Sequence, residues 1–380
     1  MLEIERLESP LTECRLMIPG PIELAPEVLA EMARPLVPHY GAEWTAFYNE
    51  TVEGLRTIFR TSGDVFLIPG SGSAGLDAAI GSVLGPQDRM LVLSNGFFGE
   101  RIGDIARRYR KNTRILSLPE DRPVTARTLQ ESLAADPEIT VVGVVHSESS
   151  SGLLNPVRDL AAVCRRMGRL MLVDAVSSLG GIELDMDEWG IDLCVSASQK
   201  CLEGPPGLGI VAVGERAWKE MRGKETPGWY LNLKVWKEFA EKWALWHPFP
   251  VTMAVPAVRA LRAGIARILE EGIESRFRRH RAMASYARGQ LQALGFVPVF
   301  DEAVASPTVL SFYGRDDLAA DTVVDRLEHE YRIRVGGGMG CFSGKAFRIG
   351  NMGPQADRAK LDVLILALRA VGRARCHYSK

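Results

Sequence analysis

The sequence predicts an α/β protein with a large domain, built on a mostly parallel mixed sheet between helices, and a small C-terminal α/β domain. From about residue 64 to 215, short apolar runs alternate with amphipathic stretches, which is typical of a sheet covered by helices on both faces. After about residue 215 the sequence turns rich in Trp and Pro, and longer helical patterns follow. A chain of 380 residues with 46% hydrophobic content is large enough to bury such a core.

The strands of the large sheet are predicted where short apolar runs are bounded by polar or glycine-rich turns. These runs span residues 65–68, 90–95, 113–118, 140–147, 170–176, 193–198 and 208–213. Between them, the helical periodicity is clearest over residues 74–85, 99–110 and 157–168. Repeated strand–helix units indicate parallel pairing, with the ligand site at the carboxyl ends of the strands.

The C-terminal third is predicted to begin with an irregular connector over residues 216–250 and one long helix over 255–294. Strands over 308–313 and 347–350 and helices over 319–331 and 356–372 then form the small domain. We therefore divide the chain into an N-terminal arm (1–20), a large domain with the connector (21–255), and the long helix with the small domain (256–380).

Composition excludes several classes of protein. The net charge is −1 and no basic stretch stands apart, which argues against nucleic-acid binding. No apolar run reaches the length of a membrane span, and the N-terminus lacks the apolar core of a signal peptide. The six cysteines are scattered without a C-x-x-C pair, which favours reduced thiols in the cytoplasm and neither a disulfide framework nor a metal site.

A glycine-rich turn after the first strand predicts a phosphate site. Gly70, Gly72 and Gly75 match G-x-G-x-x-G, and the turn opens a helix whose N-terminus can bind an anion. A nicotinamide site would require an acidic residue at the end of the next strand, for the ribose hydroxyls. That strand ends with Ser94 and Asn95, so the motif indicates a phosphate but not a dinucleotide.

Asp174 ends one predicted strand, and Lys200 follows another in a turn rich in glycine and proline. A carboxylate and an amine at neighbouring strand ends are what pyridoxal 5'-phosphate requires, the lysine as its Schiff-base partner and the aspartate beside its pyridine nitrogen. Phe98, in a glycine-flanked turn, either stacks on the cofactor ring or packs in the core. The hydroxyls after the strand ending near His146 either bond the phenolic oxygen or belong to a turn.

Taken together, the chain resembles the fold-type I, class V aminotransferases of the alanine–glyoxylate and serine–glyoxylate group. The resemblance extends over "MIPGPIELAPEVL", "GSGSAGLDAA", "SNGFFGER", "HSESSSGLLNP", "VDAVSSLGG", "SQKCLEGPPG" and "GKAFRIGNMG". It implies a homodimer with shared active sites, using pyridoxal 5'-phosphate. The implied reaction is a ping-pong transfer of an amino group from a small amino acid, alanine or serine, to an α-keto acid, glyoxylate or pyruvate.

The resemblance also implies the roles of individual residues. Lys200 and Asp174 take the catalytic positions. The cofactor would further be held by Ser71, Gly72, Ser73 and Gln199 at its phosphate, by Phe98 and Val176 on the two faces of its ring, and by Ser149 at its phenolic oxygen. The substrate would contact Arg348 through its α-carboxylate, and also Ser149, Gly20 and Tyr40, the last of these reaching in from the partner subunit.

Two departures leave alternatives open. Relatives supply phosphate ligands from the partner through a Tyr and a Thr in the connector, where this chain has Trp246 and Phe249, although His247 or Thr252 could substitute. The same stretch resembles pyridoxamine–pyruvate aminotransferase, which is the second interpretation. A cofactor-dependent lyase such as cysteine desulfurase is the third, with Cys341 as its only plausible nucleophile.

Overall fold

The computed structural model describes residues 14–110 and 112–373. Its centre is a seven-stranded sheet in the order β2-β10-β9-β8-β5-β3-β4. The strands are β2 (Asp64–Pro69), β3 (Arg89–Ser94), β4 (Arg114–Ser117), β5 (Ile139–Val145), β8 (Leu170–Asp174), β9 (Leu193–Ala197) and β10 (Leu208–Val213). Strand β10 pairs antiparallel with both of its neighbours, and the other pairs are parallel. Each strand predicted for this sheet is confirmed, as is the mixed, mostly parallel architecture.

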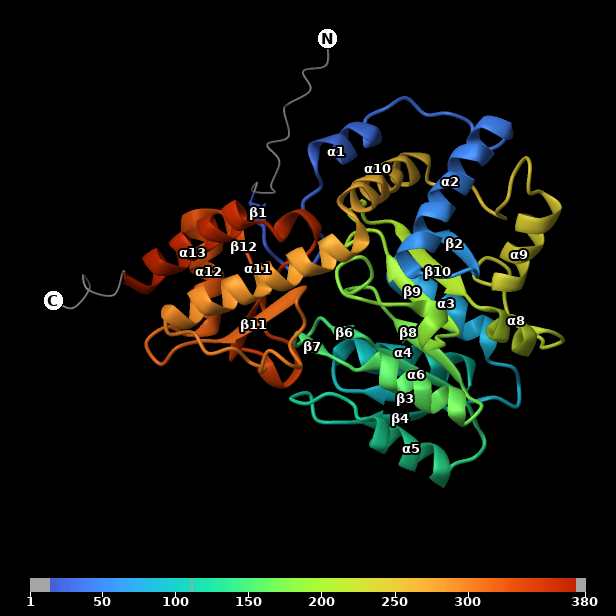
Figure 1. The fold of residues 1–380 in the computed structure, drawn as a ribbon, viewed down its shortest axis with the longest axis horizontal. Coiled ribbons are helices and arrows are strands. Elements are labelled where there is room, and N and C mark those ends of the chain that lie inside the picture. Colours follow the sequence, from blue (N-terminus) through green and yellow to red (C-terminus); the bar gives the residue numbers. More distant parts are fainter. Residues whose placement is uncertain (1–13, 111, 374–380) are drawn as a thin grey trace, which may run out of the picture.

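Helices flank the sheet (Figure 1). The residues at which these helices begin determine which side chains and backbone groups lie at the carboxyl edge of the sheet. Those nearest the site are α3 (Gly72–Val83) and α4 (Phe97–Tyr109), which pack against each other. The others around the sheet are α2 (Ala42–Phe59), α5 (Ala126–Ala135), α6 (Val157–Arg166), α7 (Met186–Trp189), α8 (Glu215–Met221) and α9 (Leu233–Lys242). Helix α1 (Pro26–Met32) packs against α10 (Val255–Glu271). A two-stranded ribbon of β6 (Ser147–Glu148) and β7 (Leu153–Leu154) follows β5.

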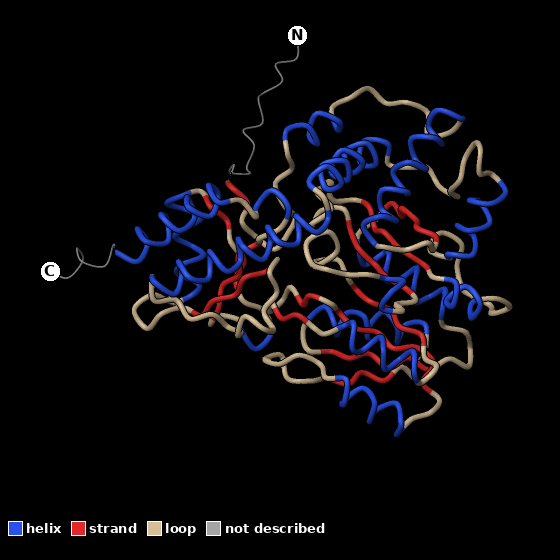
Figure 2. Tube along the Cα trace, in the orientation of Figure 1, coloured by secondary structure: helices blue, strands red, loops and turns tan. Residues whose placement is uncertain are grey.

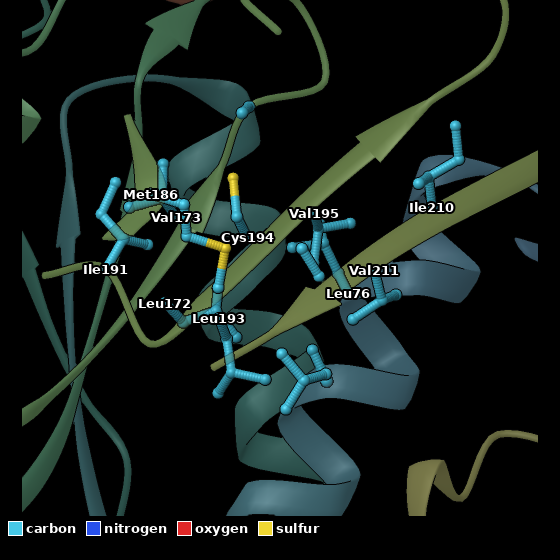
Figure 3. Close-up of a cluster of buried hydrophobic side chains, with 14 of the residues drawn as sticks. Leu76, Leu172, Val173, Met186, Ile191, Leu193, Cys194, Val195, Ile210 and Val211 are labelled. Carbon is cyan, nitrogen blue, oxygen red and sulfur yellow. The ribbon is translucent and has the colours of Figure 1, made fainter. Parts of the chain in front are cut away.

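The large core lies between this sheet and its helices. Figure 3 shows part of it, where strand β9 is buried along its whole length. Successive side chains of a strand point to opposite faces. Val195 faces α3, because a Cβ on Gly75 would lie 2.8 Å from its Cγ1. Cys194 therefore faces the opposite layer, and both faces of the strand are dry. This explains why the strands read as continuous apolar runs.

The predicted long helix is wrong in one respect, because it is two helices. Helix α10 (Val255–Glu271) ends and α11 (Ile273–Ala293) begins at Gly272. Gly272 has φ +79, a conformation that glycine adopts without the steric cost of a side chain. Its N–H closes α10 on the carbonyls of Ile268 and Leu269, and its own carbonyl accepts from Arg276 in the first turn of α11.

The C-terminal part forms a second layered unit with its own core (Figure 2). Its sheet contains β11 (Val309–Tyr313), β14 (Ala346–Gly350) and β13 (Gly336–Gly337), covered by α12 (Ala320–Tyr331) and α13 (Arg358–Arg373). Strand β1 (Arg15–Leu16) pairs with β12 (Ile333–Arg334), so this end of the predicted N-terminal arm joins the C-terminal unit. Residues 1–13 of the arm lie outside the described residues.

The described helices include none that is long and apolar enough to cross a membrane. In the same part of the chain, no cluster of three or more His, Cys, Asp or Glu side chains is placed to hold a metal ion.

Candidate active site

A cavity of about 250 Å³ opens at the carboxyl edge of the large sheet, where α3 and α4 begin. Most of the predicted site residues line it: Gly20, Ser71, Gly72, Ser73, Phe98, Ser149, Asp174, Val176, Gln199 and Lys200. It also receives Pro21, Leu76, Arg101, Val145, Ser147 and Ser177. The strand ends therefore gather side chains from segments as distant as residues 20 and 200, as the parallel topology requires.

Asp174 is the last residue of β8, in the middle of the sheet, and its side chain is buried. One carboxylate oxygen accepts the N–H of Val176 at 2.9 Å, which fixes the carboxylate at the turn leaving the strand. Burial raises the pKa of Asp174 to about 7. A buried carboxylate with this pKa is poised to bind a protonated ring nitrogen, which would restore its ionised form.

Lys200 lies three residues beyond the end of β9, is half-buried and lines the cavity. Its amine donates a hydrogen bond to the carbonyl of Pro19. The pKa of Lys200 is lowered from 10.5 to about 8, chiefly by desolvation and also by the positive charge of Arg348, while Cys201 and Asp174 raise it. An amine with this pKa has a substantial neutral fraction near physiological pH, and the neutral form is the nucleophile and the base.

Gly20 is part of the lysine's environment because its backbone touches the side chain. It has φ +89, and a Cβ there would lie 2.4 Å from Lys200 Cδ and 2.7 Å from Lys200 Nζ. A side chain here would be strained by the positive φ and would force the end of the lysine side chain to move from this position.

The start of α3 provides the phosphate donors that the glycine motif predicts. The first N–H groups of a helix have no intrahelical acceptors, and those of Gly72 and Ser73 open into the cavity. A Cβ on Gly72 would lie 2.8 Å from Val176, so the close seating of the helix also requires glycine. The side-chain oxygen of Gln199 is buried without a hydrogen-bond partner among the described residues. The neutral backbone N–H donors fit the phosphate of pyridoxal phosphate. The unpartnered Gln199 oxygen is a hydrogen-bond acceptor, so only the amide nitrogen of that side chain could donate to the phosphate.

Phe98 lines the cavity, and its position depends on a residue that the sequence analysis missed. Glu148 is fully buried, and its carboxylate accepts the N–H groups of Phe98 and Gly99 at 3.1 Å each. Its other oxygen accepts the N–H and the hydroxyl of Ser150 at 3.1 and 2.5 Å. Burial raises the pKa of Glu148 and these hydrogen bonds lower it. Glu148 therefore caps α4 and holds Phe98 against the cavity.

Arg348 is brought to the edge of the site from the C-terminal unit. It lies on β14, and its guanidinium donates to the carbonyl of Gly337 at 2.7 Å and to the carbonyl of Ser149. Burial lowers the pKa of Arg348 from its usual value. The guanidinium is thus oriented by neutral acceptors. The charge of Glu148 raises its pKa against the larger effect of burial, but no salt bridge among the described residues occupies it, so it can still pair with a substrate carboxylate.

Tyr40 is not brought into the cavity of its own chain. It is 48% exposed and contacts His39 and Trp246, with ring centroids 5.7 and 5.3 Å away. Of the two connector residues that replace the relatives' phosphate ligands, Trp246 is exposed. Phe249 is fully buried against Tyr48, at 4.8 Å between centroids, and is not available to a partner.

Cys341 is exposed, does not line the cavity, and its backbone N–H bonds Glu120 at 2.9 Å. Burial of the thiol and the neighbouring carboxylate raise the pKa of Cys341 to about 11. The thiolate that a desulfurase requires is therefore disfavoured here.

The comparisons with known proteins agree with this geometry. The profile of the family described as Aminotransferase class-V matches residues 27–361. The chain is 34% identical to alanine–glyoxylate aminotransferase of Callithrix jacchus, over 93% of this chain and 86% of the relative. It is 31% identical to pyridoxamine–pyruvate transaminase of Mesorhizobium japonicum, over 93% and 91%. A crystal structure of alanine–glyoxylate aminotransferase from Nostoc sp. superposes with a TM-score of 0.92 at 31% identity, covering 98% of both chains. The chain therefore belongs to the class-V aminotransferases, a family of enzymes that depend on pyridoxal phosphate.

Proposed function

We propose that the protein transfers an amino group from a small amino acid, alanine or serine, to glyoxylate or pyruvate, using pyridoxal phosphate bound in the cavity. The observation that carries the proposal is the placing of Asp174 and Lys200 at neighbouring strand ends, with the oriented guanidinium of Arg348 close enough to lower the lysine's pKa. A cavity of about 250 Å³ must hold the cofactor as well as the donor, which favours a donor with a short side chain.

Bound in this cavity, the cofactor would supply an electron sink that acidifies the Cα proton of the amino donor. Each residue then has a definite task. The amine of Lys200 takes the proton from Cα of the amino donor and delivers it to the carbon of the cofactor that carries the amino group. The carboxylate of Asp174 holds a proton on the ring nitrogen. Arg348 binds the α-carboxylate in a planar fork, which orients the Cα–H bond toward the lysine.

The test is a spectroscopic half-reaction. The purified protein should show the visible absorption band of the bound cofactor, and the Lys200→Ala variant should lack it. Alanine, serine, an ureido-amino acid and pyridoxamine are then mixed singly with the holoenzyme, without an acceptor. We expect alanine or serine to convert the visible band to the near-ultraviolet band of the aminated form, and glyoxylate or pyruvate to restore it. A colourless protein that binds no cofactor would refute the proposal.

The pyridoxamine–pyruvate reaction is the second candidate, favoured by the relative from Mesorhizobium japonicum. In that reaction an unphosphorylated pyridine compound is the substrate, so the phosphate donors of the cavity would have no ligand. Ser71, Ser73 and the side-chain NH2 group of Gln199 line the cavity and can donate to a phosphate, which favours the phosphorylated cofactor instead. Conversion of pyridoxamine, with no response to any amino acid, would reverse this preference.

We further propose a homodimer with shared active sites. The surface near Tyr40 carries a group of exposed apolar side chains, which in a monomer would be costly to leave in water. Its members are Leu36, Tyr40, Trp243, Leu245 and Trp246. Light scattering of the purified protein should give twice the mass of 41.7 kDa, and Trp246→Glu should shift the mass toward the monomer. A monomeric wild type would contradict the shared site.

A further inference from the structure

Arg101 is a cation of the cavity that the roles above do not use. It lies on the second turn of α4 and lines the cavity beside Ser73. Its guanidinium lies 3.4 Å from the Ser73 hydroxyl oxygen, at the start of α3. The same group lies over the rings of Phe97 and Phe98, 5.0 Å from each centroid. None of these contacts supplies a negative charge. Among the described residues the carboxylate of Asp174 acts on Arg101 through its charge, but no carboxylate forms a salt bridge with the guanidinium, which leaves its N–H groups open to an anionic ligand.

The ligand is indicated by where the guanidinium is held. The hydrogen bond to Ser73 places it at the helix N-terminus whose free N–H groups open into the cavity. The donors there are otherwise neutral: backbone N–H groups, hydroxyls and the amide of Gln199. A phosphate monoester carries a charge between about −1 and −2 near neutral pH, and burying it without a countercharge is costly. Lys200 cannot supply this countercharge, because its amine is needed at the reacting end of the cofactor.

Arg101 and Arg348 are therefore suited to two different anions, the phosphate of the cofactor and the carboxylate of the substrate. Arg348 is fixed by the carbonyls of Gly337 and Ser149, from the C-terminal unit. Arg101 belongs to the large sheet's own layer of helices and is fixed by Ser73 and two aromatic rings. We propose that Arg101 binds the phosphate of the cofactor and supplies the fixed countercharge of the phosphate site. This inference rests on the proposed function, since it requires that pyridoxal phosphate occupy the cavity.

The test separates phosphate recognition from packing by using two ligands that differ only in the phosphate. Pyridoxamine phosphate and pyridoxamine are titrated by calorimetry into the cofactor-stripped protein. Arg101→Gln keeps much of the side chain but removes the charge. We expect Arg101→Gln to lower the affinity for pyridoxamine phosphate roughly ten- to hundredfold, as for a lost charge-assisted hydrogen bond. The affinity for pyridoxamine should change less than about threefold. The affinity of Arg101→Lys for pyridoxamine phosphate should lie between those of the wild type and Arg101→Gln, because lysine keeps the charge and loses the planar fork.

The matched control is Arg108→Gln, an exposed arginine of the same helix, which should bind both ligands as the wild type does. If Arg101→Gln binds pyridoxamine phosphate within about twofold of the wild type, the inference is overturned. If both ligands weaken equally, Arg101 acts only by holding Phe98, and the inference is again overturned. A wild-type protein that binds neither ligand would instead refute the proposed function. Should Arg101→Gln not fold, Arg101→Lys decides by the same ratio of affinities.

Discussion

Replacing Lys200 by methionine should stabilise the cofactor-free protein, although it destroys the reactive amine. The folded environment lowers the pKa of Lys200 from 10.5 to about 8, chiefly by desolvation. Below pH 8 the lysine is protonated in both the folded and the unfolded state, so the fold holds a charge that its surroundings disfavour. At roughly 1.4 kcal/mol per pH unit, the difference between the two pKa values is worth about 3 kcal/mol. The hydrogen bond to Pro19, which methionine cannot make, offsets about 1 kcal/mol of this.

The pH dependence has a definite sign. Between pH 8 and 10.5 the folded protein has released the lysine's proton while the unfolded chain still binds it, so wild-type stability rises with pH relative to the variant. The advantage of Lys200→Met should therefore fall from about 2 kcal/mol at pH 7 to about 1 kcal/mol at pH 9. Above the unfolded pKa the penalty on the lysine is absent.

Urea unfolding of the cofactor-stripped proteins at pH 7 and pH 9, followed by fluorescence and circular dichroism, measures this difference. Lys219→Met is the control, because that lysine is exposed and, within the described part of the chain, its salt-bridge partner is the surface residue Glu215. Its effect should stay within about 0.5 kcal/mol at both pH values. A Lys200→Met variant that is no more stable than the wild type at pH 7, or a gap that does not narrow with pH, would refute the reasoning about the buried amine.

Three further predictions concern the residues around the lysine. Glu148→Gln replaces one of the two buried acceptor oxygens by an NH2 group that faces N–H donors, so urea unfolding should show a loss of about 1–3 kcal/mol; an unchanged stability would mean that the second oxygen contributes nothing to the cap. Arg348→Lys keeps a charge but not the fork, so the KM for the amino donor should rise about tenfold, with calorimetric affinity for pyridoxamine phosphate unchanged. Gly20→Ala forces a Cβ against the lysine and should abolish the visible cofactor band. Gly168→Ala has a similar backbone, with φ +69 and open space around it, and should keep that band; equal loss in both would implicate backbone strain alone.

The large sheet could be predicted because both of its faces are dry. A strand buried on both sides must be apolar along its whole length, and such runs are visible without any knowledge of the partners. The break between α10 and α11 was missed for a related reason. Apolar periodicity continues across Gly272, and a single glycine is compatible with a continuous helix as well as with a left-handed break. Which of the two occurs depends on packing that the sequence does not display.

Some residues of the candidate site could likewise be predicted from the sequence, and others could not. Asp174 and Lys200 could be found because strand ends of a parallel sheet converge, so residues distant in sequence are placed by topology alone. Arg348 could not be placed in this way, since it comes from the C-terminal unit, and only the resemblance indicated it. Glu148 and Arg101 were missed because their positions follow from how α4 docks. Glu148 lies three residues beyond the end of β5 and caps a helix that begins about fifty residues earlier, so its role is a tertiary contact that no local pattern displays.

The glycine-rich turn shows why a motif identifies a kind of group and not a ligand. Its match to the dinucleotide pattern follows from physics that both sites share: a helix N-terminus seated close to a strand needs glycine wherever a Cβ would collide. Here the collisions are specific, with Val176 at Gly72 and with Val195 at Gly75, both at 2.8 Å. Those contacts fix the helix to the sheet and leave its first N–H groups free, which is as much as the motif can encode. The choice between a dinucleotide and a phosphate monoester must come from charges supplied elsewhere in the fold. In this chain they are a carboxylate at the end of β8, an amine beyond β9 and, by our inference, a guanidinium on α4.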